Sequence, residues 1–325
     1  MEKEVARKIV AILNILKDSD KPIGARIIAN ELKGFGIELT ERAVRYHLRM
    51  MDERKLTERI GRKGRIITPK GIKEANDALV SDKVGMVINK VDTLSYRTTF
   101  NIETKRGDVV LNISFIPKEQ FDTALEVMKD VFTANICVTD LVAKVEEGKY
   151  LSGIVVPEGK VGFGTVCAVT INGILLNHCI PVYSKFGGIL QVDSSDPQRF
   201  TEIISYDGTS LDPAEIFIKS RMTDVLSAAS GEQGKILAGF REFPAICLDK
   251  VQMILDNLEK IGIGGVITLG KPSQPVLEIP VSAGCVGMVV LGGLNPIAAL
   301  EETGIETENM AMSTMMAYSE LMKLT

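Results

Sequence analysis

The sequence of 325 residues is poor in the side chains that most often build metal centres and catalytic sites. It contains two histidines and five cysteines, and the cysteines at positions 137, 167, 179, 247 and 285 show no CxxC spacing. Zinc sites and disulfide frameworks need such spacing or pairing, so this pattern indicates reduced thiols that are mostly buried as small apolar side chains. The sequence also lacks a nucleophile and base pair, a metal-ligand pattern and a phosphate-binding loop. We therefore expect a protein that is not an enzyme and holds no cofactor.

Long apolar runs are absent as well. No run reaches the roughly 18 residues that span a bilayer, and the chain is charged from Glu2 onward. We expect a cytoplasmic protein with neither a transmembrane helix nor a signal peptide. Its 45% apolar and 25% charged residues are typical of globular proteins. Because 325 residues exceed what one core usually supports, more than one domain is predicted.

Positive charge is concentrated in the first 80 residues, and negative charge predominates in the remainder. Residues 1–80 contain 18 Lys and Arg against 12 Asp and Glu, whereas the remainder contains 20 against 30. A basic end on a chain with a net charge of −4 indicates that only one domain contacts nucleic acid. We predict a DNA-binding domain over residues 1–80 and a second domain over residues 84–325.

The stretch from Thr40 to Thr68 has the order of a winged helix-turn-helix, with a basic helix followed by a basic hairpin. A helix with Thr40 as its N-cap places Val44, Leu48 and Met51 on one face and cations on the other. Arginine is suited to bidentate contacts with guanine edges and phosphates, so the polar face predicts a recognition helix. The DNA contacts predicted on this helix are Arg42, Arg45, Tyr46 and Arg49.

A wing and three further helices complete the predicted module. Strands over Thr57–Ile60 and Arg65–Thr68 reverse through a loop from Gly61 to Gly64, and the cations at the tip and shoulder of this hairpin would meet DNA phosphates. The helices are predicted over Glu2–Lys17, Ile23–Leu32 and Pro69–Leu79. The remaining predicted DNA contacts are Arg26, Arg62, Lys63 and Arg65.

Residues 84–325 contain an internal repeat, because short strings recur there at a separation of 99 or 100 residues. The string that begins at Gly162 resembles one that begins at Gly262, and IPV recurs at Ile180 and Ile279. Such recurrence indicates two related halves, about 84–208 and 209–325, with extra residues near 134–160 in the first. The other pairs at this separation are Gly187-Gly188 with Gly287 and Asp196-Pro197 with Asn295-Pro296, the last two both expected to open short helices. Upstream of these, and at a longer separation, Ile116-Pro117 corresponds to Phe243-Pro244, both before longer helices. The predicted fold class is α+β, with an N-terminal winged helix-turn-helix and an internally duplicated α/β effector domain with pseudo-twofold halves.

Duplicated halves usually pack about a pseudo-twofold axis, which would bring their shared glycine-rich loops together around a small ligand. Glycine lets backbone N–H groups approach anionic oxygens closely, so a carboxylate metabolite would suit such a pocket. Lys185 is the most useful cation near these loops. The same glycines also suit bulges and turns, and Cys167 and Cys285 also suit buried packing. The candidate effector-binding residues are Thr165, Cys167, Ser184, Lys185, Gly187, Gly188, Ser282, Gly284, Cys285 and Gly287.

Five strings, TERAVRYHLRMMDE, GFGTVCAVTINGILL, IPVYSKFGG, DGTSLDPAEIF and AGCVGMVVLGGLNPIAALEETGI, resemble the NrpR family of archaeal nitrogen-regulatory transcriptional repressors. The resemblance extends over essentially the whole chain. It implies a repressor of nitrogen-assimilation genes that binds palindromic operator DNA and is released by 2-oxoglutarate, its allosteric effector. Some members of the family carry two copies of the effector domain and this chain carries one. The resemblance therefore implies either a homodimer or an assembly with another chain that has an NrpR domain.

Three other functions stay open on the sequence. A winged-helix regulator of the same architecture could sense a different small metabolite, such as an amino acid. An enzyme fused to a DNA-binding domain would convert a metabolite instead of returning it unchanged, although His178 is the only histidine beyond residue 80. A purely structural DNA-binding or dimerisation protein would respond to no ligand.

Overall fold

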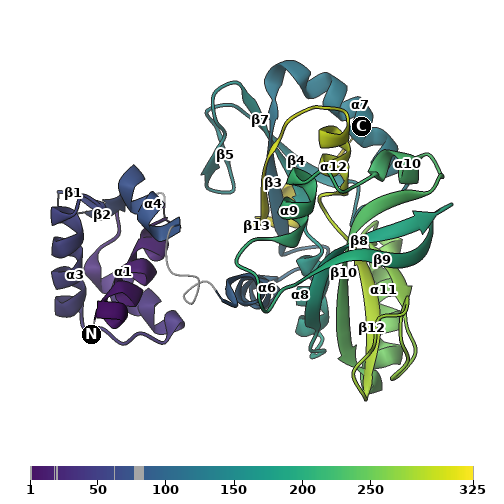
Figure 1. Ribbon diagram of the computed structural model, residues 1–325, viewed down its shortest axis with the longest axis horizontal. Helices are drawn as coiled ribbons and strands as arrows, with labels where there is room; N and C mark the ends of the chain where they lie inside the picture. The colour runs from purple at the N-terminus through teal and green to yellow at the C-terminus, as the bar shows by residue number, and fades with distance from the viewer. Residues whose placement is uncertain (1, 18, 20, 62, 77–83, 325) are drawn as a thin grey trace. The chain divides into compact units, whose positions relative to one another are not determined.

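The computed structural model describes residues 2–17, 19, 21–61, 63–76 and 84–324, without the side chains of residues 2, 3, 4 and 6. The chain forms two compact units, Met1–Val84 and Gly85–Thr325, and Figure 1 labels helices and strands in each. We describe the two units separately as unit 1 and unit 2.

Unit 1 has the element order of a winged helix-turn-helix, as the sequence predicts. The second helix is shorter than expected and continues as a 3-10 turn, the second strand begins at Gly64, and predicted helical residues 77–79 lie outside the described residues. The elements are α1 (Glu2–Lys17), α2 (Ala25–Glu31), η1 (Leu32–Phe35), α3 (Glu41–Glu53), β1 (Thr57–Ile60), β2 (Gly64–Ile67) and α4 (Pro69–Asn76).

A single apolar core joins the helices of unit 1. Ile12, Ile28, Leu48 and Met51 are fully buried within it. Because these side chains come from α1, α2 and α3, the core holds the apolar face of α3 against the rest of unit 1. The polar face of α3 is therefore left to solvent.

Helix α3 begins where the sequence predicts. The Thr40 hydroxyl accepts a hydrogen bond from the Ala43 backbone N–H at 3.2 Å, which confirms Thr40 as the N-cap. Val44, Leu48 and Met51 are fully buried, as expected for the apolar face.

Unit 2 contains two five-stranded antiparallel sheets with helices packed against them (Figure 1). The first sheet has the strand order β13-β3-β7-β4-β14, and the second has the order β11-β12-β10-β8-β9. The bounds in the first sheet are β3 (Asp108–Pro117), β4 (Leu141–Glu146), β7 (Lys160–Val166), β13 (Glu308–Ala317) and β14 (Met322–Lys323). Those in the second are β8 (Tyr183–Asp193), β9 (Asp196–Ser205), β10 (Gly234–Pro244), β11 (Val266–Leu269) and β12 (Cys285–Leu291).

The predicted duplication is confirmed by the order of the elements. The first half runs β3, η2, α7, β4, β7, α8, β8, and the second runs β10, η3, α11, β11, β12, α12, β13. A small hairpin of β5 (Tyr150–Leu151) and β6 (Ile154–Val155) falls among the extra residues expected in the first half. The helical segments are η2 (Lys118–Gln120), α7 (Phe121–Thr133), α8 (Val169–Asn177), η3 (Ala245–Cys247), α11 (Leu248–Lys260) and α12 (Asn295–Glu302), and α6 (Met86–Arg97), α9 (Pro213–Lys219) and α10 (Val225–Ala229) lie outside the repeat.

The predicted match of Ile116-Pro117 with Phe243-Pro244 is confirmed, because Pro117 and Pro244 end the equivalent strands β3 and β10, which lie 127 residues apart. The separation of 99 or 100 residues predicted from the other strings is wrong. The string at Gly162 belongs to β7, whereas the string at Gly262 follows α11, so the two are not equivalent. Asp196-Pro197 opens β9 and not a helix, while Asn295-Pro296 does open α12. Turn residues resemble one another wherever they occur, which explains the false matches.

The two halves exchange their last strands. Strand β8 ends the first half but pairs with β10 of the second, and β13 ends the second half but pairs with β3 of the first. In Figure 1 the yellow strand β13 lies beside the blue strand β3, although they come from opposite ends of unit 2. Each sheet is therefore built from both halves.

Unit 2 has two apolar cores, and each is built from side chains of both halves. One combines side chains of α7 with those of α12, and the other combines α8 with α11. Each core thus joins the longer helix of one half to the shorter helix of the other. The two halves form one folded body, which positions their facing turns around a common centre.

Candidate DNA interface and effector site

Helix α3 presents its cations on one exposed face. Arg42, Arg45, Tyr46 and Arg49 are all exposed, and their spacing of three and four residues puts them side by side. Arg45 forms an exposed ion pair with Glu41 at 2.5 Å, which is a weak interaction in water and leaves the guanidinium accessible. The structure therefore brings together the four predicted recognition residues, and their contact with DNA stays a prediction.

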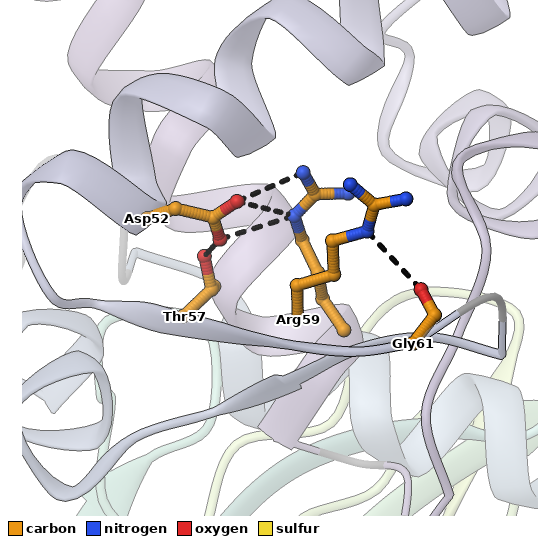
Figure 2. A network of polar contacts seen from close by, with 5 residues as sticks. Asp52, Thr57, Arg59 and Gly61 are labelled. Carbon is orange, nitrogen blue, oxygen red and sulfur yellow. Dashed lines mark hydrogen bonds and ion pairs between the residues drawn. The ribbon is translucent and has the colours of Figure 1, made fainter.

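The wing is held on the recognition helix by a polar network (Figure 2). Asp52, in the last turn of α3, accepts hydrogen bonds from Arg65 Nε at 2.8 and 3.0 Å and from the Thr57 hydroxyl at 2.6 Å. Arg65 Nη2 also lies 2.8 Å from an Asp52 oxygen, and the Arg65 side chain is only 17% exposed. Because this pair is partly buried, it fixes the position of the β-hairpin relative to α3.

This geometry corrects the expectation that Arg65 is displayed to phosphates at the shoulder of the wing. Its charge is neutralised by Asp52, so it positions the wing. Among the other predicted contacts, Lys63 on the wing and Arg26 on α2 are exposed, and Arg62 lies outside the described residues.

Sequence reasoning missed Arg59. It is exposed on β1 directly opposite Arg65, and its Nε donates a hydrogen bond to the Gly61 carbonyl at 3.1 Å (Figure 2). The alternation of strand residues could have indicated an outward cation here, but the predicted contacts cover only the tip and shoulder of the hairpin. Arg59 supplies the exposed charge at the wing that was assigned to Arg65.

A cavity of about 70 Å³ lies where the two halves of unit 2 meet. Its walls come from β8 and the turn between β7 and α8 in the first half, and from β10, β13 and the turn between β12 and α12 in the second. Three predicted effector residues line it, Cys167, Gly187 and Gly188, and a fourth, Thr165, accepts a hydrogen bond from Asn112 in its wall at 3.3 Å. Five glycines line the cavity: Gly187, Gly188, Gly239, Gly292 and Gly293.

Lys185, the most useful cation near the predicted effector loops, forms an ion pair in the structure. Its Nζ lies 3.1 Å from the Glu242 carboxylate, which is buried and also accepts a hydrogen bond from the Ser282 backbone N–H at 3.1 Å. Burial alone raises the pKa of Glu242, but hydrogen bonds from Ser282 and Lys185 outweigh it and hold the pKa below its ordinary value. Lys185 therefore neutralises a buried carboxylate.

The other predicted effector residues are not part of the cavity wall. Ser184 accepts a hydrogen bond from Asn172 at 3.0 Å, and Gly284 donates one to the Ser273 hydroxyl at 2.9 Å. Gly287 is packed so closely that an added Cβ would lie 2.9 Å from the Phe240 ring. The cavity wall contains only some of the predicted residues. Ser282 and Gly284 lie just before β12, and Cys285 and Gly287 are among its first residues, outside the wall.

A buried cation in the cavity wall, Arg241 of β10, is a residue that the sequence reasoning missed. It is 4% exposed, and its Nη1 donates hydrogen bonds to the Ala168 carbonyl at 2.9 Å and to the Asn172 side-chain oxygen. Burial lowers the pKa of Arg241, although a guanidinium stays charged in proteins. The charged pair Arg241-Glu242 within the mostly apolar end of β10 was the available signal in the sequence.

Membrane-spanning helices and metal clusters are absent from the part of the chain that the structure describes. No helix there is long and apolar enough to cross a membrane. Within the same residues, no group of three or more His, Cys, Asp or Glu side chains could hold a metal ion.

Comparison with known proteins finds relatives of both units. The model of the NrpR regulatory domains NRD1 and 2 matches residues 84–323, and that of the Ribonuclease R winged-helix domain matches residues 10–75. The Global nitrogen regulator NrpRI of Methanosarcina mazei is 43% identical over 324 residues, which cover 100% of both chains. The Global nitrogen regulator NrpR of Methanocaldococcus jannaschii is 32% identical over 99% of this chain and 56% of its own length. A crystal structure of a nitrogen repressor-like protein from Methanococcus jannaschii matches with a TM-score of 0.63 and 30% identity, over 74% of this chain and 98% of that chain.

Proposed function

The chain belongs to the NrpR family, and from this premise we propose that it is a transcriptional repressor of nitrogen-assimilation genes that 2-oxoglutarate releases from DNA. The family resemblance predicted from the sequence is confirmed by the match over residues 84–323 and by the full-length relative. The relatives are named as nitrogen regulators, which supports a regulator over an enzyme.

The observation that carries the DNA-binding part is the exposed face of α3. Three arginines and a tyrosine lie together there, and the wing beside them is fixed by Asp52 and Arg65. Arginine reads guanine edges and binds phosphates, so the face suits insertion into a major groove. A twofold dimer would place two such helices about 34 Å apart, and the operator would then be a palindrome.

Release by an effector requires a difference in affinity between two states of the protein. The effector must bind the state that is unable to hold DNA more tightly than the state that holds it. A typical coupling free energy of about 1–3 kcal/mol would weaken operator binding roughly 5- to 150-fold. The duplicated unit 2, with a cavity between its halves, supports a ligand-sensing role for this part of the chain.

The first test is DNA binding measured by fluorescence anisotropy with the full chain. The DNA is a palindromic site from the promoter of a nitrogen-assimilation gene, and a scrambled duplex of equal length is the control. We expect salt-sensitive binding to the palindrome that 2-oxoglutarate weakens at millimolar concentrations, whereas succinate and glutamate do not.

Each alternative function gives a different result in the same assay. Weakening by glutamate or another amino acid, and not by 2-oxoglutarate, would favour a regulator that senses a different metabolite. Conversion of 2-oxoglutarate during the measurement would favour an enzyme fused to a DNA-binding domain. Equal affinity for the palindrome and the scrambled duplex would contradict the proposed repressor.

A further inference from the structure

We propose that a groove along the outer edge of strand β11 binds an extended, basic segment of a partner protein. The segment would pair with β11 as an additional strand of the second sheet, a mode in which main-chain hydrogen bonds supply affinity and alternate side chains supply specificity. The groove has no part in the proposed function, so its occupancy is independent of DNA and effector binding.

The groove is a second hollow in unit 2, with a volume of about 490 Å³ against about 70 Å³ for the cavity between the halves. Its walls come from α11, β11, the loop that joins them, residues 135–140 and Lys323. None of its lining residues belongs to the wall of the smaller cavity. We call this second hollow the edge groove.

The first argument is the direction of the edge groove. All four residues of β11 line it, although their side chains belong to different faces of the sheet. Ile267 packs against one apolar core of unit 2 and Leu269 packs against the other. A hollow that is lined by residues of both faces must run beside the strand, so the edge groove follows the edge of β11.

The second argument is the unused backbone of β11. Strand β12 is the one strand that pairs with it in the described part of the chain. Gly265 and Gly270, at the two ends of β11, point toward β12, because the Gly265 carbonyl accepts from Leu291 at 2.7 Å and the Gly270 N–H donates to Gly287 at 2.9 Å. Backbone groups alternate in direction along an antiparallel strand. The neighbouring residues of these glycines, Val266 and Leu269, therefore turn their N–H and C=O groups away from β12, toward the edge groove.

The third argument is a contrast between the two edges of the second sheet. Strand β9, at the opposite edge, carries Pro197, Arg199 and Glu202, and prolines and charges are devices that prevent an edge from pairing with another chain. Strand β11, with the sequence VITL, has neither a proline nor a charge. The edge of β11 is therefore able to accept a strand where the edge of β9 resists one.

The fourth argument is the charge of the walls, which selects a basic partner. Three carboxylates line the edge groove, and Lys323, the one Lys or Arg among its described lining residues, is paired with Asp140 at 3.2 Å. The other two carboxylates, Asp256 and Glu259, are exposed and lie three residues apart on α11, so they share a face of the helix. Alternate side chains of an extended segment point to the same side. Lys or Arg at alternate positions would therefore meet this acidic face.

The edge groove also contains a polar atom that has no partner in the described structure. The hydroxyl oxygen of Thr268 is buried and makes no hydrogen bond there. Buried polar atoms in proteins are nearly always hydrogen-bonded. This hydroxyl is therefore available to a polar group of the incoming segment.

The test is fluorescence anisotropy of a labelled hexapeptide of alternating Lys and Val, titrated with the full chain. A hexapeptide of alternating Glu and Val is the charge control. Two further peptides carry N-methyl groups either on every Lys amide or on every Val amide, which removes the donors of one edge or of the other. Both methylated peptides have the same composition and charge, so they differ only in the edge that can still pair.

We expect the Lys-Val peptide to bind and the Glu-Val peptide not to bind. One methylated peptide should bind about tenfold more weakly than the other, because two or three main-chain hydrogen bonds are lost at about 0.5–1.5 kcal/mol each. This comparison uses the wild-type chain and does not depend on the folding of any variant.

A double variant, Asp256→Asn with Glu259→Gln, tests the acidic face. It should weaken Lys-Val binding at least about threefold, as expected for the loss of two exposed ion pairs. The matched control is Asp249→Asn with Glu202→Gln, which removes two exposed carboxylates outside the edge groove and should leave the affinity unchanged. The melting temperature shows that each variant is folded.

Four outcomes would overturn the proposal: no binding of the Lys-Val peptide, equal binding of the Glu-Val peptide, equal binding of the two methylated peptides, or wild-type affinity in the folded double variant. Sedimentation of the full chain with and without the peptide tests the choice of occupant. An oligomer that the peptide dissociates would show that a second copy of the chain fills the edge groove, and it would overturn the choice of a partner protein.

Discussion

The recognition helix and the central cavity both contain arginine, but under opposite conditions. The arginines of α3 stand in water, where salt screens them and each contributes modestly. Arg241 is buried, where its charge is little screened and one contact has a large effect. The difference teaches that one chain can hold exposed cations, which suit a long polyanion, together with a buried cation in the wall of a small cavity.

The largest expected effect is on DNA binding. Replacing Arg42, Arg45 and Arg49 together with glutamine should weaken operator binding at least about a hundredfold, since each bidentate contact with a base contributes roughly 1–3 kcal/mol. The side chains are exposed, so the melting temperature should stay near that of the wild type. Anisotropy on operator DNA measures the loss, and 2-oxoglutarate affinity in the same variant should not change. Unaltered operator affinity would remove α3 from the interface.

Salt separates the two kinds of site. Operator affinity should fall steeply between about 50 and 200 mM salt, because each phosphate contact contributes about 0.9 to the slope of log affinity against log salt concentration. The affinity for 2-oxoglutarate should show a much smaller slope, because the cation in the cavity wall, Arg241, is buried. Replacement of Arg59 by glutamine should reduce the DNA slope by about one. Equal slopes for both ligands would contradict the contrast between exposed and buried arginines.

A third prediction concerns Asp212 and pH. Burial raises the pKa of Asp212 to about 6 from an ordinary 3.8. Between these values the folded state keeps a proton that the unfolded state releases, so stability should fall as the pH rises from about 4 to 6. The effect of this group is on the order of 2–3 kcal/mol. Glu215, whose pKa burial also raises, contributes in the same direction.

Urea unfolding at several pH values measures this dependence. Asp212→Asn should flatten the fall in stability, while Glu232→Gln, on an exposed turn, should not. The idea fails if the Asp212→Asn variant and the wild type show the same pH dependence.

The smallest effect is expected at the wing. Asp52→Asn should lower the stability of unit 1 by about 1 kcal/mol, because it weakens a partly buried ion pair. The exposed pair between Arg54 and Glu74 is the matched control, and Arg54→Gln should have almost no effect. Thermal unfolding measures both. Similar losses in the two variants would show that burial of the Asp52 pair is unimportant.

Unit 1 was largely predictable because its determinants are local. The N-cap at Thr40, the helical period of α3 and the glycines of the wing all act within a few residues. The role of Arg65 was not predictable, because its partner Asp52 lies 13 residues away and the contact depends on how the hairpin packs on α3.

The fold class and the duplication of unit 2 were predictable from the sequence, but the matching of equivalent residues and the strand pairing were not. The duplication could be inferred, but equivalent strands such as β8 and β13 begin 125 residues apart, at Tyr183 and Glu308. Turn strings at a shorter separation gave false matches. The exchange of β8 and β13 depends on pairing between distant segments, which no local pattern encodes. The candidate site therefore shifted from Lys185 to Arg241.

The strand exchange also constrains how the chain is made. Strand β13 pairs with β3, and the Met312 N–H donates to the Asn112 side chain 200 residues earlier. During synthesis the first sheet stays incomplete, with an unpaired edge on β3, until the residues of β13 have left the ribosome. Such an edge is a site where nascent chains can associate wrongly. Correct assembly of unit 2 should therefore depend on the rate of synthesis and on chaperones more than that of the locally determined unit 1.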